Sequence, residues 1–153
     1  MKTLMKFTQD RIERMLYRHS LWLVNDKDGI RADFTEVDLS GVNFTEACLR
    51  LAIFNKSNCT EANFTGAILE GASFFNVDFT KSVFTQANLS NTWFGHCILN
   101  DASMFGSYLY RAYFTDCAVS NLFLRSTCLH STEFSNCDLK TAKLDFVQTT
   151  LLK

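Results

Sequence analysis

Three of the six cysteines occur at a fixed spacing of 20 residues, at Cys97, Cys117 and Cys137. Cysteine thiols can form disulfides, bind zinc or act as nucleophiles. The spacing brings these three thiols into one line if the chain returns to the same position every 20 residues. Thiols stacked in this way lie alongside one another and lack the tetrahedral arrangement that zinc requires. We therefore expect small buried residues at these positions, and no metal site.

The remaining residues with catalytic potential do not form a recognisable site. His19, His96 and His130 are the three histidines of the chain, and none is placed to activate a cysteine nucleophile. Glycine is scarce, at 6 residues, and no glycine-rich phosphate-binding loop is present. The sequence therefore predicts a protein that is not an enzyme and that needs no cofactor.

Length and composition restrict the class of protein further. A chain of 153 residues suits one domain, and its net charge of −1 argues against a nucleic-acid binder that relies on bulk positive charge. No apolar run of about 18 residues could span a membrane. Charges interrupt the opening stretch "MKTLMKFTQDRIERM", which therefore lacks the apolar segment of a secretory signal. We expect a cytoplasmic protein with reduced thiols.

The element that must position all these side chains is a repeat of five residues. From Phe34 to Leu144 every fifth residue, 23 in all, is apolar or cysteine, and the residue two before each is nearly always small. A step of five scatters side chains around an α-helix and reverses faces on a strand. The chain must therefore turn once every five residues, so that each large residue points toward a common axis.

A step of 20 residues, or four repeats, groups these central positions into four columns of similar residues, so that one coil has four sides. One column is entirely Phe: Phe34, Phe54, Phe74, Phe94, Phe114 and Phe134. A second is entirely Leu: Leu49, Leu69, Leu89, Leu109 and Leu129. Like residues stack on like when successive coils lie directly above one another. The sequence therefore predicts nearly six four-sided coils, with large residues on the axis and small residues at the corners.

The repeat resembles the pentapeptide-repeat family, whose motif is A(D/N)LXX. Matching stretches include "ADFTE" from Ala32, "ANFTG" from Ala62 and "ANLSN" from Ala87. The resemblance implies an all-β solenoid, a right-handed quadrilateral parallel β-helix with an N-terminal α-helical cap. We divide the chain into a capping helix and turn (1–31), the β-helix (32–147) and a short tail (148–153). A solid rod of this kind offers no interior pocket for a substrate.

A stack of coils leaves unpaired backbone groups at both ends, which must be covered. Residues 8–24 read as an amphipathic helix with Thr8 as its N-cap, and we expect it to cover the first coil. A helix that binds a partner or a membrane surface is the alternative. At the other end Phe146, Leu151 and Leu152 could cover the last coil or contact a second copy, since the resemblance includes dimers joined through this region.

Outward positions change character in the C-terminal half of the repeat. Small polar groups dominate up to residue 91, after which aromatic residues and arginine gather. These residues are typical of protein interfaces, although packing between coils is the alternative explanation. The predicted partner-binding residues are Trp93, Phe105, Tyr108, Tyr110, Arg111, Tyr113 and Phe123.

The repeat is acidic, and this raises a second function. Residues 32–146 contain 12 Asp or Glu and 7 Lys or Arg, a balance of −5. Some members of the resembled family imitate DNA and bind gyrase or topoisomerase IV. The carboxylates here are spread over all four sides, and the loop insertions of the quinolone-resistance members are absent. We therefore expect a protein-binding scaffold, with the gyrase-directed DNA mimic and a phage or effector protein with a host target as alternatives.

Overall fold

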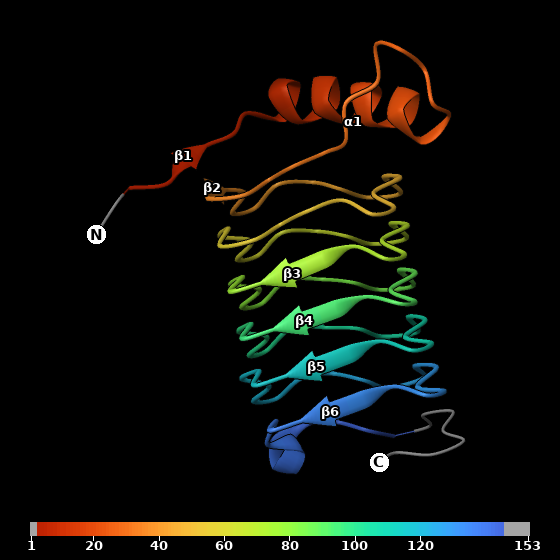
Figure 1. Cartoon of the computed structure of the whole chain (residues 1–153). Helices are drawn as coiled ribbons and strands as arrows, with labels where there is room; N and C mark the ends of the chain where they lie inside the picture. Colours follow the sequence, from red (N-terminus) through yellow and green to blue (C-terminus); the bar gives the residue numbers. More distant parts are fainter. Residues whose placement is uncertain (1–2, 146–153) are drawn as a thin grey trace.

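The computed structural model describes residues 3–145 and shows one stack of coils with a helix across its first end (Figure 1). It is a right-handed quadrilateral β-helix, which confirms the fold expected from the five-residue repeat. No helix in the described part of the chain is long and apolar enough to cross a bilayer. The elements are β1 (Met5–Lys6), α1 (Gln9–Leu23), β2 (Val37–Asp38), β3 (Ser73–Phe75), β4 (Trp93–Gly95), β5 (Tyr113–Thr115), β6 (Glu133–Ser135) and the 3-10 helix η1 (Leu139–Thr141).

Each coil pairs with the next in a parallel register of four repeats, so that Phe74 lies beside Phe94. Strands β3, β4, β5 and β6 lie side by side in this register, and the other sides are joined by isolated parallel bridges such as the one between Cys48 and Ile68. We number the sides by the first inward residue of each column. Side 1 begins at Phe34, side 2 at Leu39, side 3 at Phe44 and side 4 at Leu49.

The axis of the stack is a continuous column of buried side chains, as the sequence predicted. The Phe column of side 1 is fully buried from Phe34 to Phe94, and its rings stack from coil to coil. The ring centroids of Phe74 and Phe94 are 4.6 Å apart, and those of Phe94 and Phe114 are 4.4 Å apart. Burial of these large apolar side chains is the main source of stability in the coil.

The polar residues of the repeat complete its backbone hydrogen bonding. The side chain of Asn63, just before a central position, accepts hydrogen bonds from both the N–H (3.0 Å) and the hydroxyl (2.6 Å) of Thr65. Asp78 and Thr80 form the same arrangement. Asp and Asn favour this local turn because their side-chain oxygen reaches the backbone two residues on. The motif thus places Asp or Asn before many central residues and Thr after them.

Each corner is formed by the residue two places after a central position. Asn91 at such a corner has a φ of 57°, in the left-handed region, and its N–H donates to the carbonyl of Tyr110 on the next coil at 2.8 Å. Glycine and asparagine adopt this conformation most readily. Leu51 (φ 61°) and Arg111 (φ 54°) also occupy corners, and their side chains project outward.

The first coil is covered by α1, which begins where the sequence placed it. Thr8 is the N-cap, and its hydroxyl accepts from the N–H of Arg11 at 3.3 Å. Ile12 is fully buried, and Met15 and Leu16 pack against the core. The amphipathic pattern therefore predicted the buried face of this cap correctly.

His19 connects α1 to the first coil through two hydrogen bonds. Its Nδ1 accepts from the N–H of Ala32 at 3.1 Å, so the proton is on Nε2, which donates to the carbonyl of Arg50 at 3.0 Å. In lower coils these backbone groups pair with other coil residues, as when Leu51 donates to Glu70. The imidazole of His19 thus provides hydrogen-bond partners for two backbone groups of the first coil, which has no preceding coil to supply them.

The cap also contains a strand that the sequence did not indicate. β1 (Met5–Lys6) pairs in parallel with β2 on side 2, and the Phe7 N–H continues the pairing to Asp38. The side chain of Gln9 donates to the carbonyl of Asn43 on side 3 at 3.2 Å. These contacts cover two edges of the first coil that the helix alone does not reach.

The last described coil is less well covered than the first. Phe134, Leu139 and Leu144 are only half-buried, whereas Leu124 in the coil above is fully buried. The regular turn gives way to η1, which Asp138 caps through its side chain. Phe146, Leu151 and Leu152, expected at this end, lie outside the described residues.

Candidate functional site

The cysteine column forms as expected, with thiols that are occupied by backbone contacts. The sulfur atoms of Cys97 and Cys117 donate to the carbonyls of Phe74 and Phe94, at 3.3 and 3.2 Å. All six cysteines are free thiols. A hydrogen bond with Cys117 and burial both raise the pKa of Cys97, which keeps this thiol protonated and unreactive near neutral pH.

The three histidines lie far apart from one another and in different surroundings. His19 is buried under the cap, and burial lowers its pKa. His96 occupies a corner, 3.9 Å from a carboxylate oxygen of Asp116, and His130 is exposed on side 4. Among residues 3–145, no three His, Cys, Asp or Glu side chains are grouped so that they could hold a metal ion.

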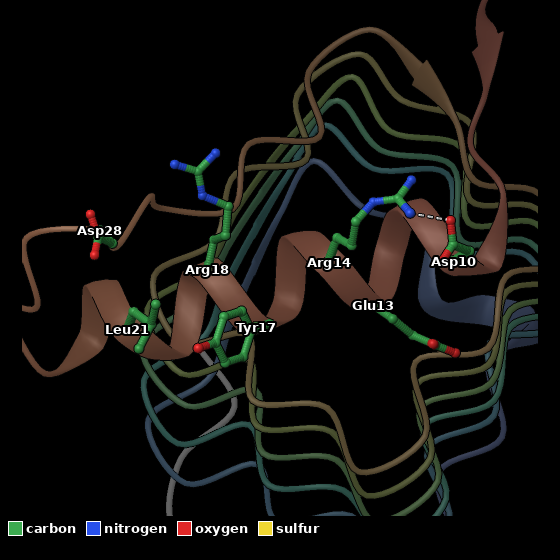
Figure 2. Close-up of a pocket in the computed structure, with 7 residues that line it drawn as sticks. All are labelled: Asp10, Glu13, Arg14, Tyr17, Arg18, Leu21 and Asp28. Atoms are coloured by element: carbon green, nitrogen blue, oxygen red, sulfur yellow. Dashed lines mark hydrogen bonds and ion pairs between the residues drawn. The ribbon is translucent and has the colours of Figure 1, made fainter.

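A depression on the outer side of α1 is lined mainly by charged residues (Figure 2). Arg14 forms an ion pair with Asp10 one turn away, and Tyr17 is exposed beside them. The lining contains two arginines and three carboxylates but no His, Cys or Ser. Arg14 pairs with Asp10, and the mixture of exposed cations and carboxylates is typical of a solvated helix face. Its residues are Asp10, Glu13, Arg14, Tyr17, Arg18, Leu21 and Asp28.

A surface of another kind occupies sides 4 and 1 in the C-terminal half of the stack. We call it the aromatic patch, and it consists of Trp93, Tyr108, Tyr110, Arg111 and Tyr113. The four aromatic side chains are 37–57% exposed, with Tyr108 the most exposed, and Arg111 is exposed at the corner between the two sides. The large accessible apolar area in one place is typical of an interaction surface.

Trp93 is held by a contact that the sequence did not predict. It is the register partner of Tyr113 on the following coil, but its ring stacks on Phe75 of the preceding coil, with centroids 5.6 Å apart. The space for this contact comes from Gly95. A Cβ atom at Gly95 would lie 2.7 Å from the indole and 3.0 Å from Phe75. Part of this aromatic surface is therefore packing between coils.

Tyr110 and Arg111 form a second stack on the patch. The Tyr110 ring lies against His130 of the next coil, with centroids 5.6 Å apart, and the Arg111 guanidinium carbon is 4.9 Å from the centroid of Tyr110. No other hydrogen bond or ion pair of this guanidinium is found within the described chain. Its planar donors therefore remain available to solvent or to a ligand.

Phe105 and Phe123 form a separate pair on side 3. Their ring centroids are 6.2 Å apart, and the Arg125 guanidinium lies 6.0 Å from the Phe123 ring while pairing with Asp145. The fold thus divides the predicted residues into a patch on sides 4 and 1 and a pair on side 3. Sequence reasoning missed Phe75 and His130, although their register positions one coil from Gly95 and Tyr110 could have indicated these contacts.

Charge is distributed unevenly around the stack. Seven of the twelve repeat carboxylates lie on side 2 or at its two corners: Glu36, Asp38, Glu61, Asp78, Asp101, Asp116 and Asp138. The three side 4 segments within residues 86–131 contain no carboxylate. The side 4 part of the aromatic patch therefore lies on a surface without carboxylates, whereas on side 1 Glu133 is the register partner of Tyr113.

Both the sequence and the structure of this chain resemble those of known proteins. The family model for pentapeptide repeats matches residues 30–55, 57–95, 82–118 and 107–145, in 8 copies. No curated protein matches the sequence.

The solved structures that have a similar fold include those of QnrB1 and alr5209. A trypsin-treated form of QnrB1, a plasmid-mediated fluoroquinolone resistance protein, has a TM-score of 0.65 at 16% identity, covering 78% of this chain and 61% of that one. This chain thus spans about three fifths of the length of that structure. The pentapeptide repeat protein alr5209 from Nostoc PCC 7120 has a TM-score of 0.58 at 19% identity, covering 94% and 99% of the two chains. At these identities the likeness concerns the fold.

Proposed function

This chain belongs to the pentapeptide-repeat family, and from that premise we propose that it is a non-catalytic module that binds another protein through the aromatic patch. The observation that carries the proposal is the exposure of four aromatic side chains and one arginine on adjoining sides of a rigid stack. Tyr, Trp and Arg dominate the binding energy of protein interfaces.

The scaffold suits this role because it holds the patch residues on regular coils. Trp93 and Tyr113 are fixed in register on β4 and β5, and Tyr110 is held by its stack on His130. Side chains that are already ordered lose less conformational freedom when a partner binds. Along the described coils the axis is filled by buried side chains such as Phe74 and Phe94, which also favours a surface-binding role over catalysis.

Affinity capture with two variants tests the proposal. The Trp93→Ser, Tyr113→Ser double variant removes half of the aromatic rings of the patch, and Tyr17→Ser removes an equally exposed ring from the cap as a control. We expect a partner that is retained by the wild type and by Tyr17→Ser and is lost with the double variant. Retention by a double variant that still melts cooperatively would contradict the proposal.

The acidic side 2 supports a second candidate, a DNA mimic directed at gyrase or topoisomerase IV. Its carboxylates are the densest of the repeat, but several are paired with cations. Lys56 lies 3.7 Å from Glu36, and Lys6 lies 3.9 Å from Asp38. These pairs interrupt the continuous negative potential that a DNA mimic presents, so we rank this function second.

A gyrase supercoiling assay, with and without a fluoroquinolone, separates the two candidates. Under the docking proposal we expect no inhibition and no protection from the drug at tens of micromolar protein. Inhibition or protection that is lost on Asp78→Asn would favour the DNA mimic instead.

We also propose that a second copy covers the last coil. Phe134, Leu139 and Leu144 leave the end of the core half-exposed in the described chain, and an end-to-end pair would bury it. Light scattering after size-exclusion chromatography should give a dimer mass for the wild type and a monomer mass for Leu144→Asp. A monomeric wild type would contradict this arrangement.

A further inference from the structure

We propose that the aromatic patch recognises a short acidic segment of its partner, in which a carboxylate binds Arg111 and neighbouring aromatic side chains pack on the tyrosines. This inference rests on the proposed docking function and adds the chemistry of the partner. It is carried by the charge of side 4 and by the contacts that hold Arg111.

The local charge favours an anionic ligand. The segments of side 4 within residues 86–131 lack carboxylates, and Arg111 is their one formal cation. In the coils nearer the cap the same side carries Arg50, whose charge is paired with Glu70 at 3.3 Å. Arg111 has no such partner within residues 3–145, so in this part of the chain its charge is available to a ligand carboxylate.

The guanidinium of Arg111 is held in position for binding. Its central carbon lies 4.9 Å from the centroid of the Tyr110 ring, and that ring in turn stacks on His130 of the next coil. Stacking occupies the face of the guanidinium and leaves its N–H edge available. That edge matches the two oxygens of a carboxylate, which it can bind through two parallel hydrogen bonds.

The rings beside Arg111 define the rest of the ligand. Tyr108 is 57% exposed and Tyr113 is 45% exposed, so both present apolar faces close to the arginine in sequence and on adjoining sides. Such faces accommodate aromatic or aliphatic side chains. A segment in which acidic and aromatic residues alternate would satisfy both features.

The surroundings favour a protein segment over a nucleic acid. A single-stranded nucleic acid needs a cationic groove along its backbone, as well as rings for stacking. Here the aromatic patch holds one cation, the whole repeat has a charge balance of −5, and Glu133 is the register partner of Tyr113. A long polyanion would be repelled beyond the patch, whereas a short acidic segment fits within it.

Fluorescence anisotropy with defined peptides tests the inference. The probe is a fluorescein-labelled peptide that alternates Glu and Phe, and its counterpart replaces each Glu by Gln. We expect the wild type to bind the Glu peptide at least about tenfold more tightly than the Gln peptide, and added salt to weaken this preference. Arg111→Gln should abolish the preference, whereas the matched control Arg50→Gln should retain it.

Three outcomes would overturn the inference. They are equal or absent binding of the two peptides by the wild type, a Glu preference that persists in Arg111→Gln, and tighter binding of a labelled oligothymidylate than of the Glu peptide. If Trp93→Ser with Tyr113→Ser abolishes capture of the protein partner while Arg111→Gln does not, the docking function stands and only this inference fails.

Discussion

The indole of Trp93 stacks on Phe75 of the preceding coil, with ring centroids 5.6 Å apart, although its register partner on the following coil is Tyr113. The contact passes over Gly95, which is buried beneath the indole. The orientation of Trp93 in the patch therefore depends on the missing side chain of a glycine.

We predict that Gly95→Ala displaces the Trp93 ring without disrupting the coil. The added Cβ would lie 2.7 Å from the indole, and Gly95 does not have a positive φ, so the backbone accepts alanine. In a Trp22→Phe background, the fluorescence emission of Trp93 should shift to longer wavelength as the ring becomes more exposed. Thr115→Ala, at the same register position one coil later, is the control and should leave the emission unchanged. An unchanged spectrum in Gly95→Ala would contradict the role given to this glycine.

The stability of the protein should depend on pH through His19. Burial lowers the pKa of His19 from 6.5, so the unfolded chain takes up the proton more readily than the folded chain. Protonation of Nδ1 would also break its bond from Ala32. The free energy of unfolding should therefore be constant above about pH 7 and fall as the pH drops below about 6.5 toward the lower folded pKa.

Urea denaturation between pH 8 and about pH 5 measures this effect before most carboxylates titrate. His19→Gln can keep one donor and one acceptor but does not titrate, so its stability should change much less over the same range. Equal pH dependence of the two proteins would show that His19 is not responsible. The nearby positive charge of Arg31 acts in the same direction, and Arg31→Gln should reduce the dependence.

Replacing a phenylalanine in the middle of the Phe column should destabilise the protein more than replacing the one at its end. Phe94 is fully buried between the rings of Phe74 and Phe114, and its replacement by alanine should cost about 3–5 kcal/mol. Among the described residues Phe134 stacks only on Phe114, and it is half-buried, so Phe134→Ala should cost less than half as much. Chemical denaturation of both variants makes the comparison. Equal losses would mean that the last coil is covered as fully as the others.

One small inward residue is poorly matched to its site. The hydroxyl of Ser82 is buried and has no hydrogen-bond partner among residues 3–145. Those of Ser57 and Ser107 donate to the carbonyls of Phe54 and Met104 at 2.7 Å. Ser82→Ala should be neutral or stabilise the protein by about 1 kcal/mol, because it removes an unpaired polar group. Ser57→Ala and Ser107→Ala should each destabilise by about 1 kcal/mol. Thermal unfolding of the three variants measures these differences. A Ser82→Ala variant that is less stable than the other two would contradict the prediction.

Thiol labelling should follow burial rather than sequence order. Burial raises the pKa of Cys59 to about 12 and that of Cys137 to about 11, so little thiolate exists at pH 8. Iodoacetamide should modify the half-exposed Cys48 and Cys128 first and should reach Cys59 and Cys97 only after unfolding. Mass mapping of tryptic peptides gives the order. Rapid labelling of Cys59 in the native protein would contradict the packing of the axis.

The sequence predicted the core because that core repeats. Once the position of a central residue in the repeat is known, its neighbours follow from the spacing. Phe74, for example, contacts Phe79 in the next repeat and Phe94 in the next coil. The helix pattern likewise predicted that Ile12 is buried. β1 was not predicted, since two residues carry too little periodicity to indicate a strand and its pairing depends on the cap. The stack of Trp93 on Phe75 was not predicted because outward rings have several rotamers, and the register restricts only the backbone.

The parallel register between coils also determines how the length of this protein can change. Adding one whole coil would lengthen the axis by about 4.8 Å and leave every later side chain on its original side. Adding a single repeat would turn everything after the insertion by a quarter of a revolution, so that Tyr108 would leave side 4 and face a different direction relative to α1. The position of a residue in the sequence therefore determines both its distance along the axis of the stack and the side toward which it points. Only the insertion of whole coils preserves the orientation of the patch relative to the cap.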